Sequence, residues 1–161
     1  MNLGNIAGII CKALFPINEE VFFGNSNSSI AVCTLSSMKL LKEIANSSLM
    51  SKIVVVGRLF SENKGIDSLV KYVISNKNIK TILICGKDTS GHIPARSLLN
   101  LYKNGVDNDG RIIDSSSPDP VLTLTQSQID EFQRQVKIVN KIGETSISEL
   151  NLLVDSILQT Q

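Results

Sequence analysis

The only histidine of this 161-residue chain, His92, lies in a loop that follows a short apolar run. The run at 82–85 ends at Gly86, and its continuous apolar character is typical of a strand buried on both faces of a parallel sheet. Gly86 and Gly91 would allow the loop backbone to approach a ligand closely. In open α/β sheets, ligands bind where such loops leave the carboxyl ends of strands, so His92 lies at a position suited to chemistry.

The residue types around this sheet edge argue against several common chemistries. Ser-His-Asp hydrolysis is possible in principle, but the sequence contains no Gly-x-Ser-x-Gly elbow. A dinucleotide site would need Gly-x-Gly-x-x-Gly after the first predicted strand, where Thr34, Leu35, Ser36 and Ser37 stand, and no P-loop is present. One histidine and three scattered cysteines do not form a closed set of zinc ligands. A single imidazole on a loop above a cleft is instead a sensible lower ligand for a large, flat metal cofactor.

The overall composition is that of an ordinary globular domain, with 42% hydrophobic and 19% charged residues. A net charge of +1 indicates no broad attraction to nucleic acid or to anionic membranes, so we expect no nucleic-acid partner. Three cysteines without metal-type spacing indicate a reducing compartment. The sequence shows neither a signal-peptide pattern nor an apolar stretch long enough to span a membrane. We therefore expect a cytoplasmic protein with no direct membrane span.

Strand and helix patterns alternate along the chain. Apolar and β-branched runs predict strands at 29–34, 53–57, 82–85, 110–113 and 136–142. Apolar residues at helical spacing predict helices at 38–44, 65–75, 94–104, 127–135 and 146–158. Together these patterns predict a single Rossmann-like α/β domain at 28–161, with a mostly parallel sheet of about five strands and helices on both faces. Residues 1–27, with the pair Phe22 and Phe23, are predicted to form an N-terminal lead-in.

This fold would gather loops at the carboxyl edge of the sheet, but a fold identifies a place for a ligand and no reaction. The loops concerned are 33–37, 57–64, 86–92 and 107–117. Their residues also have simpler interpretations, because loop acids often form turns and buried cysteines such as Cys33 and Cys85 often act as small apolar residues. The segment 114–120 has the most loop-like composition, and it could be a plain connection or could cover a cofactor.

Nine short segments form a distinctive pattern, which includes Gly-His-Ile at 91–93. The segments are 31–35, 65–67, 74–76, 82–86, 91–93, 97–99, 104–107, 109–113 and 132–136. In order and spacing they closely resemble the A subunit of tetrahydromethanopterin S-methyltransferase. Members of that family carry the corrinoid in a methanogen complex that moves a methyl group from methyl-tetrahydromethanopterin to coenzyme M and couples the transfer to sodium transport.

The resemblance implies a methyltransferase that depends on partner subunits. It implies a cobamide cofactor, either cobalamin or 5-hydroxybenzimidazolylcobamide, because the family's Gly-His-Ile histidine coordinates cobalt from below. His92 matches that histidine and is the implied axial ligand. The implied activity is a methyl carrier that accepts a methyl group from methyl-tetrahydromethanopterin or a similar donor and passes it to coenzyme M or another thiol. The implied partners are the methyl-donor and methyl-acceptor methyltransferase subunits.

A histidine that ligates a metal usually donates its other ring N–H to a carboxylate or a carbonyl group. Glu62 follows the second predicted strand, which a simple arrangement places beside the third, so its side chain could meet His92 across neighbouring loops. Asp88 lies in the same loop as His92 and could instead bond local backbone N–H groups. We favour Glu62 as the partner of His92.

The corrin ring is broad and carries amide groups on its rim, so glycine-rich backbone and small hydroxyls are its natural contacts. The expected cofactor contacts are Cys33, Thr34, Leu35, Ser36, Ser37, Gly57, Glu62, Asn63, Gly86, Asp88, Gly91, His92, Ile93, Ser97, Pro118 and Pro120.

The sequence departs from the family pattern at three places. The family's Lys-Thr-Glu-Asn before Gly-Ile is matched only as Ser61-Glu62-Asn63, with Phe60 in the first place. Pro94, Ala95 and Arg96 follow Gly-His-Ile, where the family commonly has a small residue, glycine and glutamine. The membrane-bound family member ends in a spanning helix, whereas this sequence stops at Gln161 after an amphipathic stretch, so a soluble form is expected. Two alternatives stay open. One is a corrinoid-binding or storage module without turnover, and the other is a Rossmann-like small-molecule binder that has lost the corrinoid.

Overall fold

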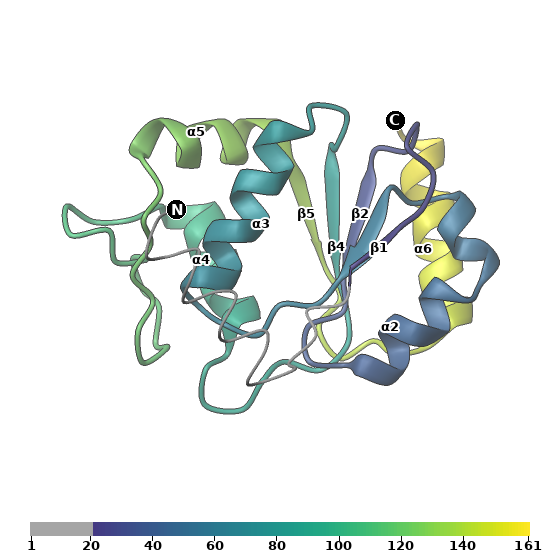
Figure 1. The fold of residues 1–161 in the computed structure, drawn as a ribbon, viewed down its shortest axis with the longest axis horizontal. Helices are drawn as coiled ribbons and strands as arrows, with labels where there is room; N and C mark the ends of the chain where they lie inside the picture. The colour runs from purple at the N-terminus through teal and green to yellow at the C-terminus, as the bar shows by residue number, and fades with distance from the viewer. Residues whose placement is uncertain (1–20) are drawn as a thin grey trace, which may run out of the picture.

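Four parallel strands and one short antiparallel strand form the sheet in the computed structural model, which describes residues 21–161 (Figure 1). The central strands are continuously apolar because helices cover both of their faces. Along the chain the elements are β1 (Phe22–Phe23), β2 (Ile30–Cys33), α2 (Met38–Ala45), the 3-10 helix η1 (Ser48–Ser51), β3 (Val55–Gly57), α3 (Lys64–Ser75), β4 (Thr81–Ile84), α4 (Pro94–Asn104), α5 (Gln126–Gln135), β5 (Lys137–Asn140) and α6 (Ile147–Gln159).

The strands lie in the order β1-β3-β2-β4-β5 across the sheet. The chain therefore leaves β2 in one direction to form β3, and α3 then carries it back across β2 to form β4 on the other side. This reversal between β2 and β4 is a topological switch point. In open α/β sheets, the crevice outside the carboxyl ends of the strands at such a point is the usual ligand site.

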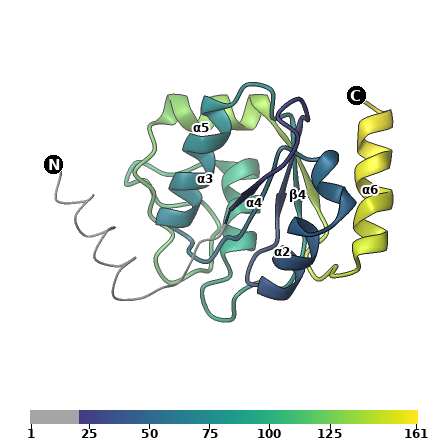
Figure 2. The same cartoon turned by 45° about the vertical axis from the view of Figure 1, so that its right-hand side comes forward.

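Two hydrophobic clusters fill the space between the sheet and its helices. Helices α3, α4 and α5 cover one face, and α2 and α6 cover the other (Figures 1 and 2). Successive side chains of a strand point to opposite faces, so Ala31 and Cys33 of β2 pack in the first cluster, and Ile30 and Val32 pack in the second. This double burial confirms the predicted Rossmann-like α/β class.

The predicted strand at 110–113 is wrong. Arg111 and Ile112 form only isolated bridges, with Val121 and Val106 respectively, outside the sheet. The position beside β4 is occupied by β5, and residues 110–113 pair locally within the connection between α4 and α5. The side chain of Asp107 instead accepts hydrogen bonds from the backbone N–H groups of Asp109 and Arg111, which closes a local turn.

The fifth strand of the sheet is β1, which lies within the predicted lead-in. Phe22 pairs with Val56 and Phe23 with Val55, both antiparallel. A strand of two residues carries no periodic pattern, so the sequence did not indicate it. The division into a lead-in and a domain stays a prediction, because residues 1–20 lie outside the described part of the chain.

A buried carboxylate ties the long connection between α4 and α5 to helix α3. Asp67 is 7% exposed, and both of its oxygens lie 3.1 Å from the backbone nitrogen of Thr123. The hydroxyl of Thr123 donates to Asp67 Oδ2 at 2.7 Å. These contacts hold a segment that has neither helix nor strand against the core.

We expect Asp67→Ala to lower the free energy of unfolding by about 1–3 kcal/mol, because it leaves the Thr123 N–H without its partner. Urea denaturation measures the change. Asp109→Ala is the matched control, since Asp109 is exposed and its carboxylate makes no hydrogen bond within the described residues. The control is expected to stay within about 0.5 kcal/mol of the wild type. Equal losses in the two variants would contradict the structural role of Asp67.

Within residues 21–161 no helix has the length and apolar character needed to cross a membrane.

Candidate functional site

An imidazole and a carboxylate meet at the carboxyl edge of the sheet. His92 lies in the loop between β4 and α4, and Glu62 lies in the loop between β3 and α3. The Nδ1 atom of His92 is 3.1 Å from Oε1 and 3.0 Å from Oε2 of Glu62. The contact expected between these two side chains is therefore present. Their role toward a cofactor stays a prediction.

The expectation that Glu62 and His92 follow neighbouring strands is wrong. Strand β2 lies between β3 and β4, so the loops of Glu62 and His92 do not follow neighbouring strands. Glu62 lies just before Asn63, the N-cap of α3, the crossover helix that takes the chain back over β2 to β4. Its place at the start of this crossover accounts for the contact.

The two partners differ strongly in exposure. The Glu62 side chain is 2% exposed and the His92 side chain is 59% exposed. Burial alone would raise the pKa of Glu62. The backbone N–H of Glu62, the His92 ring and the Asp119 N–H favour the charged form more strongly, and they lower the pKa of Glu62 below its ordinary value. Glu62 is therefore an ionised acceptor at neutral pH.

The ionised carboxylate sets the tautomer of His92. A carboxylate only accepts hydrogen bonds, so Nδ1 is the donor and carries the ring proton. In the neutral ring Nε2 then has a free lone pair. Within the described part of the chain Nε2 makes no hydrogen bond. The arrangement presents one nitrogen to the outside in a form that can ligate a metal.

A segment between α4 and α5 closes over Glu62. The backbone N–H of Asp119 donates to Glu62 Oε1 at 3.1 Å, and the side chain of Asn63 donates to the backbone oxygen and Oδ2 of Asp119, each at 3.2 Å. Pro118 and Pro120 flank Asp119. The structure therefore brings this proline segment to the site, as its loop-like composition allowed.

The loop after β2 is tied to the His92 loop. The backbone N–H and the hydroxyl of Ser36 both donate to the Lys87 carbonyl, at 3.0 and 2.6 Å, and the Lys87 N–H donates to the Ser37 hydroxyl at 2.9 Å. Arg58 adds a hydrogen bond to the Ser36 carbonyl at 3.0 Å. The loops after β2, β3 and β4 thus form one connected rim at the switch point.

Gly86 and Gly91 serve this rim in different ways. Gly86 has a φ of +75°, and a Cβ atom there would lie 2.4 Å from the carbonyl oxygen of Thr34. Gly91 has a φ of +83° with open space around it. The loops after β2 and β4 therefore approach so closely at Gly86 that only glycine fits, whereas Gly91 only supplies a backbone conformation.

Asp88 has the local role that was its alternative interpretation. Its Oδ1 accepts hydrogen bonds from the backbone N–H groups of Thr89 and Ala95, at 3.0 and 3.2 Å, and so caps α4. In the described part of the chain, Asp88 Oδ2 and Thr89 Oγ1 are buried without a hydrogen-bond partner. Both atoms lie on the loop that carries His92, so this loop holds polar groups that a bound molecule could satisfy.

Three of the expected contact residues are directed into the protein. Thr34 and Leu35 are fully buried, and Ser97 is 1% exposed with its hydroxyl bonded to two other serines. Ile93 directly follows His92 and has a φ of 37°. The structure gives these residues roles in shaping the loops, and their contact with a cofactor stays a prediction.

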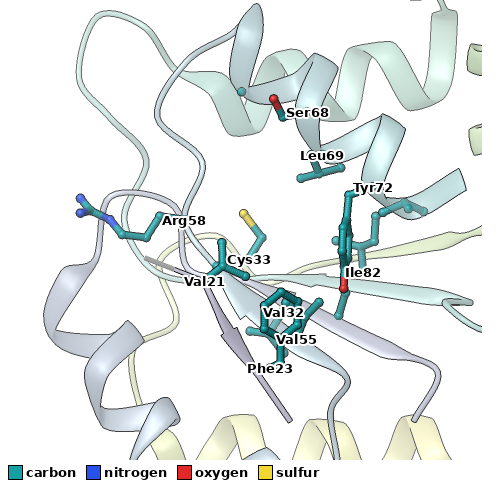
Figure 3. A pocket seen from close by; sticks show the side chains of 14 residues that line it. Val21, Phe23, Val32, Cys33, Val55, Arg58, Ser68, Leu69, Tyr72 and Ile82 are labelled. Atoms are coloured by element: carbon teal, nitrogen blue, oxygen red, sulfur yellow. The ribbon is translucent and has the colours of Figure 1, made fainter. Parts of the chain in front are cut away.

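A cavity of about 360 Å³ opens beside this rim, between the sheet and α3 (Figure 3). Figure 3 shows Ser68, Leu69 and Tyr72 along the helix on one side, and Val32, Cys33 and Val55 on the sheet on the other. Cys33 and Gly57, both expected contact residues, line the cavity, and most of the lining is apolar. Burial raises the pKa of the Cys33 thiol to about 12, so Cys33 is a neutral, apolar wall.

Sequence reasoning missed Ser115, Ser117 and Asp119 as members of the site. Ser117 donates a hydrogen bond to the backbone oxygen of His92, and Asp119 donates to Glu62. The only available signal was three successive serines before a proline, in a stretch with two open interpretations, a plain connection or a cover for a cofactor.

Comparisons with known proteins agree on one family. The family model that describes the A subunit of tetrahydromethanopterin S-methyltransferase matches residues 12–161. A protein of Methanosarcina acetivorans, named as the A subunit of a proposed methyltransferase, Mtx, is 33% identical over 141 residues, which cover 87% of this chain and 68% of the relative. Its counterpart in Methanosarcina barkeri is 36% identical over 146 residues, with 90% and 70% coverage. The A subunit of tetrahydromethanopterin S-methyltransferase from Methanosphaera stadtmanae is 36% identical over 137 residues, with 84% and 53% coverage.

Proposed function

Since the chain belongs to the family of the tetrahydromethanopterin S-methyltransferase A subunit, a family of methyltransferase subunits, we propose that it is a cobamide-binding methyl carrier with His92 as the axial ligand of cobalt. The methyl donor in this proposal is methyl-tetrahydromethanopterin or a similar compound, and the acceptor is coenzyme M or another thiol. Separate methyltransferase subunits bring the donor and the acceptor to the cofactor.

The observation that carries the proposal is the state of the His92 ring. Its Nδ1–H is held by a buried carboxylate that accepts through both oxygens, and its Nε2 lies on a side chain that is 59% exposed. A carboxylate behind a metal-bound imidazole fixes the ring orientation and raises its basicity.

The residues around His92 fit a cobamide. The corrin rim carries amide groups, and the buried, unpartnered Asp88 Oδ2 and Thr89 Oγ1 on the His92 loop could pair with such amides. When bound, the cobalt supplies a centre that accepts a methyl group and hands it on. The chain itself supplies the axial nitrogen through His92, the fixed ring orientation through Glu62, and a rigid rim through Gly86 and the Ser36–Lys87 hydrogen bonds.

Cobalamin loading followed by a methyl-transfer assay tests the function. The full chain is incubated with cobalamin and separated from free cofactor by gel filtration. The bound cofactor is then reduced and mixed with labelled methyl-tetrahydromethanopterin in the presence of the donor-specific methyltransferase. If the protein is red and acquires the label, the result supports a methyl carrier. If it is red but never acquires the label, the result would instead identify the corrinoid-storage alternative.

The apolar cavity beside α3 favours a second candidate function, the binding of a small apolar molecule without any corrinoid. Its lining is mostly apolar, and its volume suits a compact ligand. This candidate predicts that the purified wild-type chain stays colourless after incubation with cobalamin under both oxidising and reducing conditions. Stoichiometric colour after gel filtration would rule it out as the principal function.

A further inference from the structure

Three serine hydroxyls form a chain that ends on the backbone of His92. The Ser97 hydroxyl lies 2.8 Å from that of Ser115 and 2.6 Å from that of Ser117. The Ser117 hydroxyl donates to the carbonyl oxygen of His92 at 2.6 Å. Ser97 and Ser117 are 1% and 2% exposed. The chain therefore links α4 and the connection after it to the loop of His92 through two buried hydroxyls, those of Ser97 and Ser117, and the partly buried hydroxyl of Ser115.

The direction of this chain is fixed by its last member. A carbonyl oxygen only accepts hydrogen bonds, so the Ser117 hydroxyl donates its single proton to the His92 carbonyl. The Ser117 oxygen therefore accepts the hydrogen bond from the Ser97 hydroxyl. Because the Ser97 hydroxyl donates to Ser117, its oxygen accepts the hydrogen bond from the Ser115 hydroxyl. The Ser115 oxygen also accepts a hydrogen bond from the backbone N–H of Ser117, at an N–O distance of 3.3 Å. All three hydroxyls point one way, an arrangement in which each bond strengthens the next.

The carbonyl of His92 directly precedes a residue with an unfavourable backbone conformation. Ile93, the next residue, has a positive φ of 37° and is the N-cap of α4, and its own side chain makes no capping hydrogen bond. This conformation costs a residue with a Cβ about 1–2 kcal/mol, so it needs support from its surroundings. The hydrogen bond from Ser117 supplies such support directly before Ile93.

The same short segment also holds the partner of His92. Asp119, two residues after Ser117, donates its N–H to Glu62 Oε1 at 3.1 Å. Ser117 therefore fixes the backbone of His92 while Asp119 fixes the carboxylate that His92 contacts. The His92 imidazole and the Glu62 carboxylate are thus both held by hydrogen bonds from the same short segment, which keeps their relative position constant.

We propose that Ser117 is a positioning residue for His92, itself oriented by Ser97 and Ser115, and that it holds the imidazole so that Nε2 points to the axial site in one direction. The inference rests on the proposed function, in which His92 is the axial ligand. Loss of the Ser117 hydroxyl frees the His92 carbonyl, loosens the ring against Glu62 and admits the second tautomer.

The single histidine of the chain makes this directly observable, because ¹⁵N-histidine labelling of the full chain gives imidazole signals from His92 alone. In the cobamide-free wild type we expect the signals of one tautomer with the proton on Nδ1. In Ser117→Ala we expect averaged signals from both tautomers and about tenfold weaker cobalamin binding. In Ser117→Thr, which keeps the hydroxyl, we expect signals closer to those of the wild type.

Two controls separate positioning from general stability. Ser90→Ala removes an exposed serine of the same loop that makes no hydrogen bond in the described residues. Gln135→Ala removes three hydrogen bonds to backbone carbonyls near the end of α3, at the opposite edge of the sheet. Both are expected to keep the wild-type imidazole signals. Gln135→Ala is the control for a variant that loses stability.

Wild-type imidazole signals in a folded Ser117→Ala would overturn the proposal. If that variant does not fold, Ser97→Ala replaces it, since it removes the donor to Ser117 and leaves the bond to His92 in place. In Ser97→Ala, a shift of the imidazole signals in the direction expected for Ser117→Ala, but smaller, supports the proposal. Unchanged imidazole signals in Ser97→Ala overturn it. The NMR arm contains no cobamide, so failure of the wild type to bind cobalamin would refute the proposed function without altering this result.

Discussion

Glu62→Gln is expected to weaken cobalamin binding about 10–100-fold, the usual effect of removing the carboxylate behind a metal-bound histidine. Glutamine keeps the shape of the side chain but removes the charge that fixes the proton on Nδ1 of His92. The amide can also turn its NH₂ group toward the ring, which would force the other tautomer and place the proton on Nε2. The titration is followed by visible absorption of the bound cofactor.

Two variants sharpen this prediction. Glu149→Gln, an exposed carboxylate on α6, has the same chemical change away from the site and is expected to bind as the wild type does. Glu62→Asp keeps the charge but withdraws it by one methylene, so it is expected to lie between the wild type and Glu62→Gln. Wild-type affinity in Glu62→Gln would remove Glu62 from the account of the site.

Gly86→Ala is expected to lower the free energy of unfolding by at least about 3 kcal/mol, from the combined costs of a left-handed backbone and of overpacking. The new methyl group would lie 2.4 Å from the Thr34 carbonyl and 2.8 Å from the Ser37 hydroxyl. The carbonyl belongs to the backbone that follows β2 and cannot rotate away, so the loops after β2 and β4 must separate.

Gly91→Ala is the matched control for this variant. It has a similar positive φ of +83°, but a methyl group there meets nothing within 4 Å. Its expected loss is therefore only the conformational cost, about 1–2 kcal/mol. Urea denaturation of the two variants separates the free-energy cost of the close contact at Gly86 from the cost of the left-handed backbone conformation. Equal losses would show that the close approach at Gly86 contributes nothing.

The helices and central strands could be predicted because their signals are local. Apolar residues at 66, 70 and 73 recur at helical spacing, and the run at 82–85 is uninterrupted, so each pattern identifies its own element. The run at 110–113 has the same local character but forms only isolated bridges outside the sheet, and β5 takes the place beside β4. Strand formation depends on a partner strand, and the local sequence does not specify which strand that is.

The site could be predicted only where one residue type was unique. His92 is the sole imidazole and follows a strand, which identified it directly. Glu62 was one of two candidate partners for His92, with Asp88, and the choice between them rested on a strand order that the fold does not have. Ser117 and Asp119 reach the site through the course of a long connection, which contacts such as Asp67–Thr123 fix from far along the chain. No local pattern carries that information.

The most direct test of the central claim is electron paramagnetic resonance of the full chain loaded with cobalamin and reduced to Co(II), prepared with natural and with ¹⁵N-labelled histidine. If His92 is the axial ligand, the nitrogen splitting changes from a triplet to a doublet on labelling. In His92→Ala, no splitting that depends on the histidine label is expected. If the bound cofactor keeps the same triplet in labelled protein, the axial nitrogen is that of the cofactor's own base. That result would contradict ligation by His92.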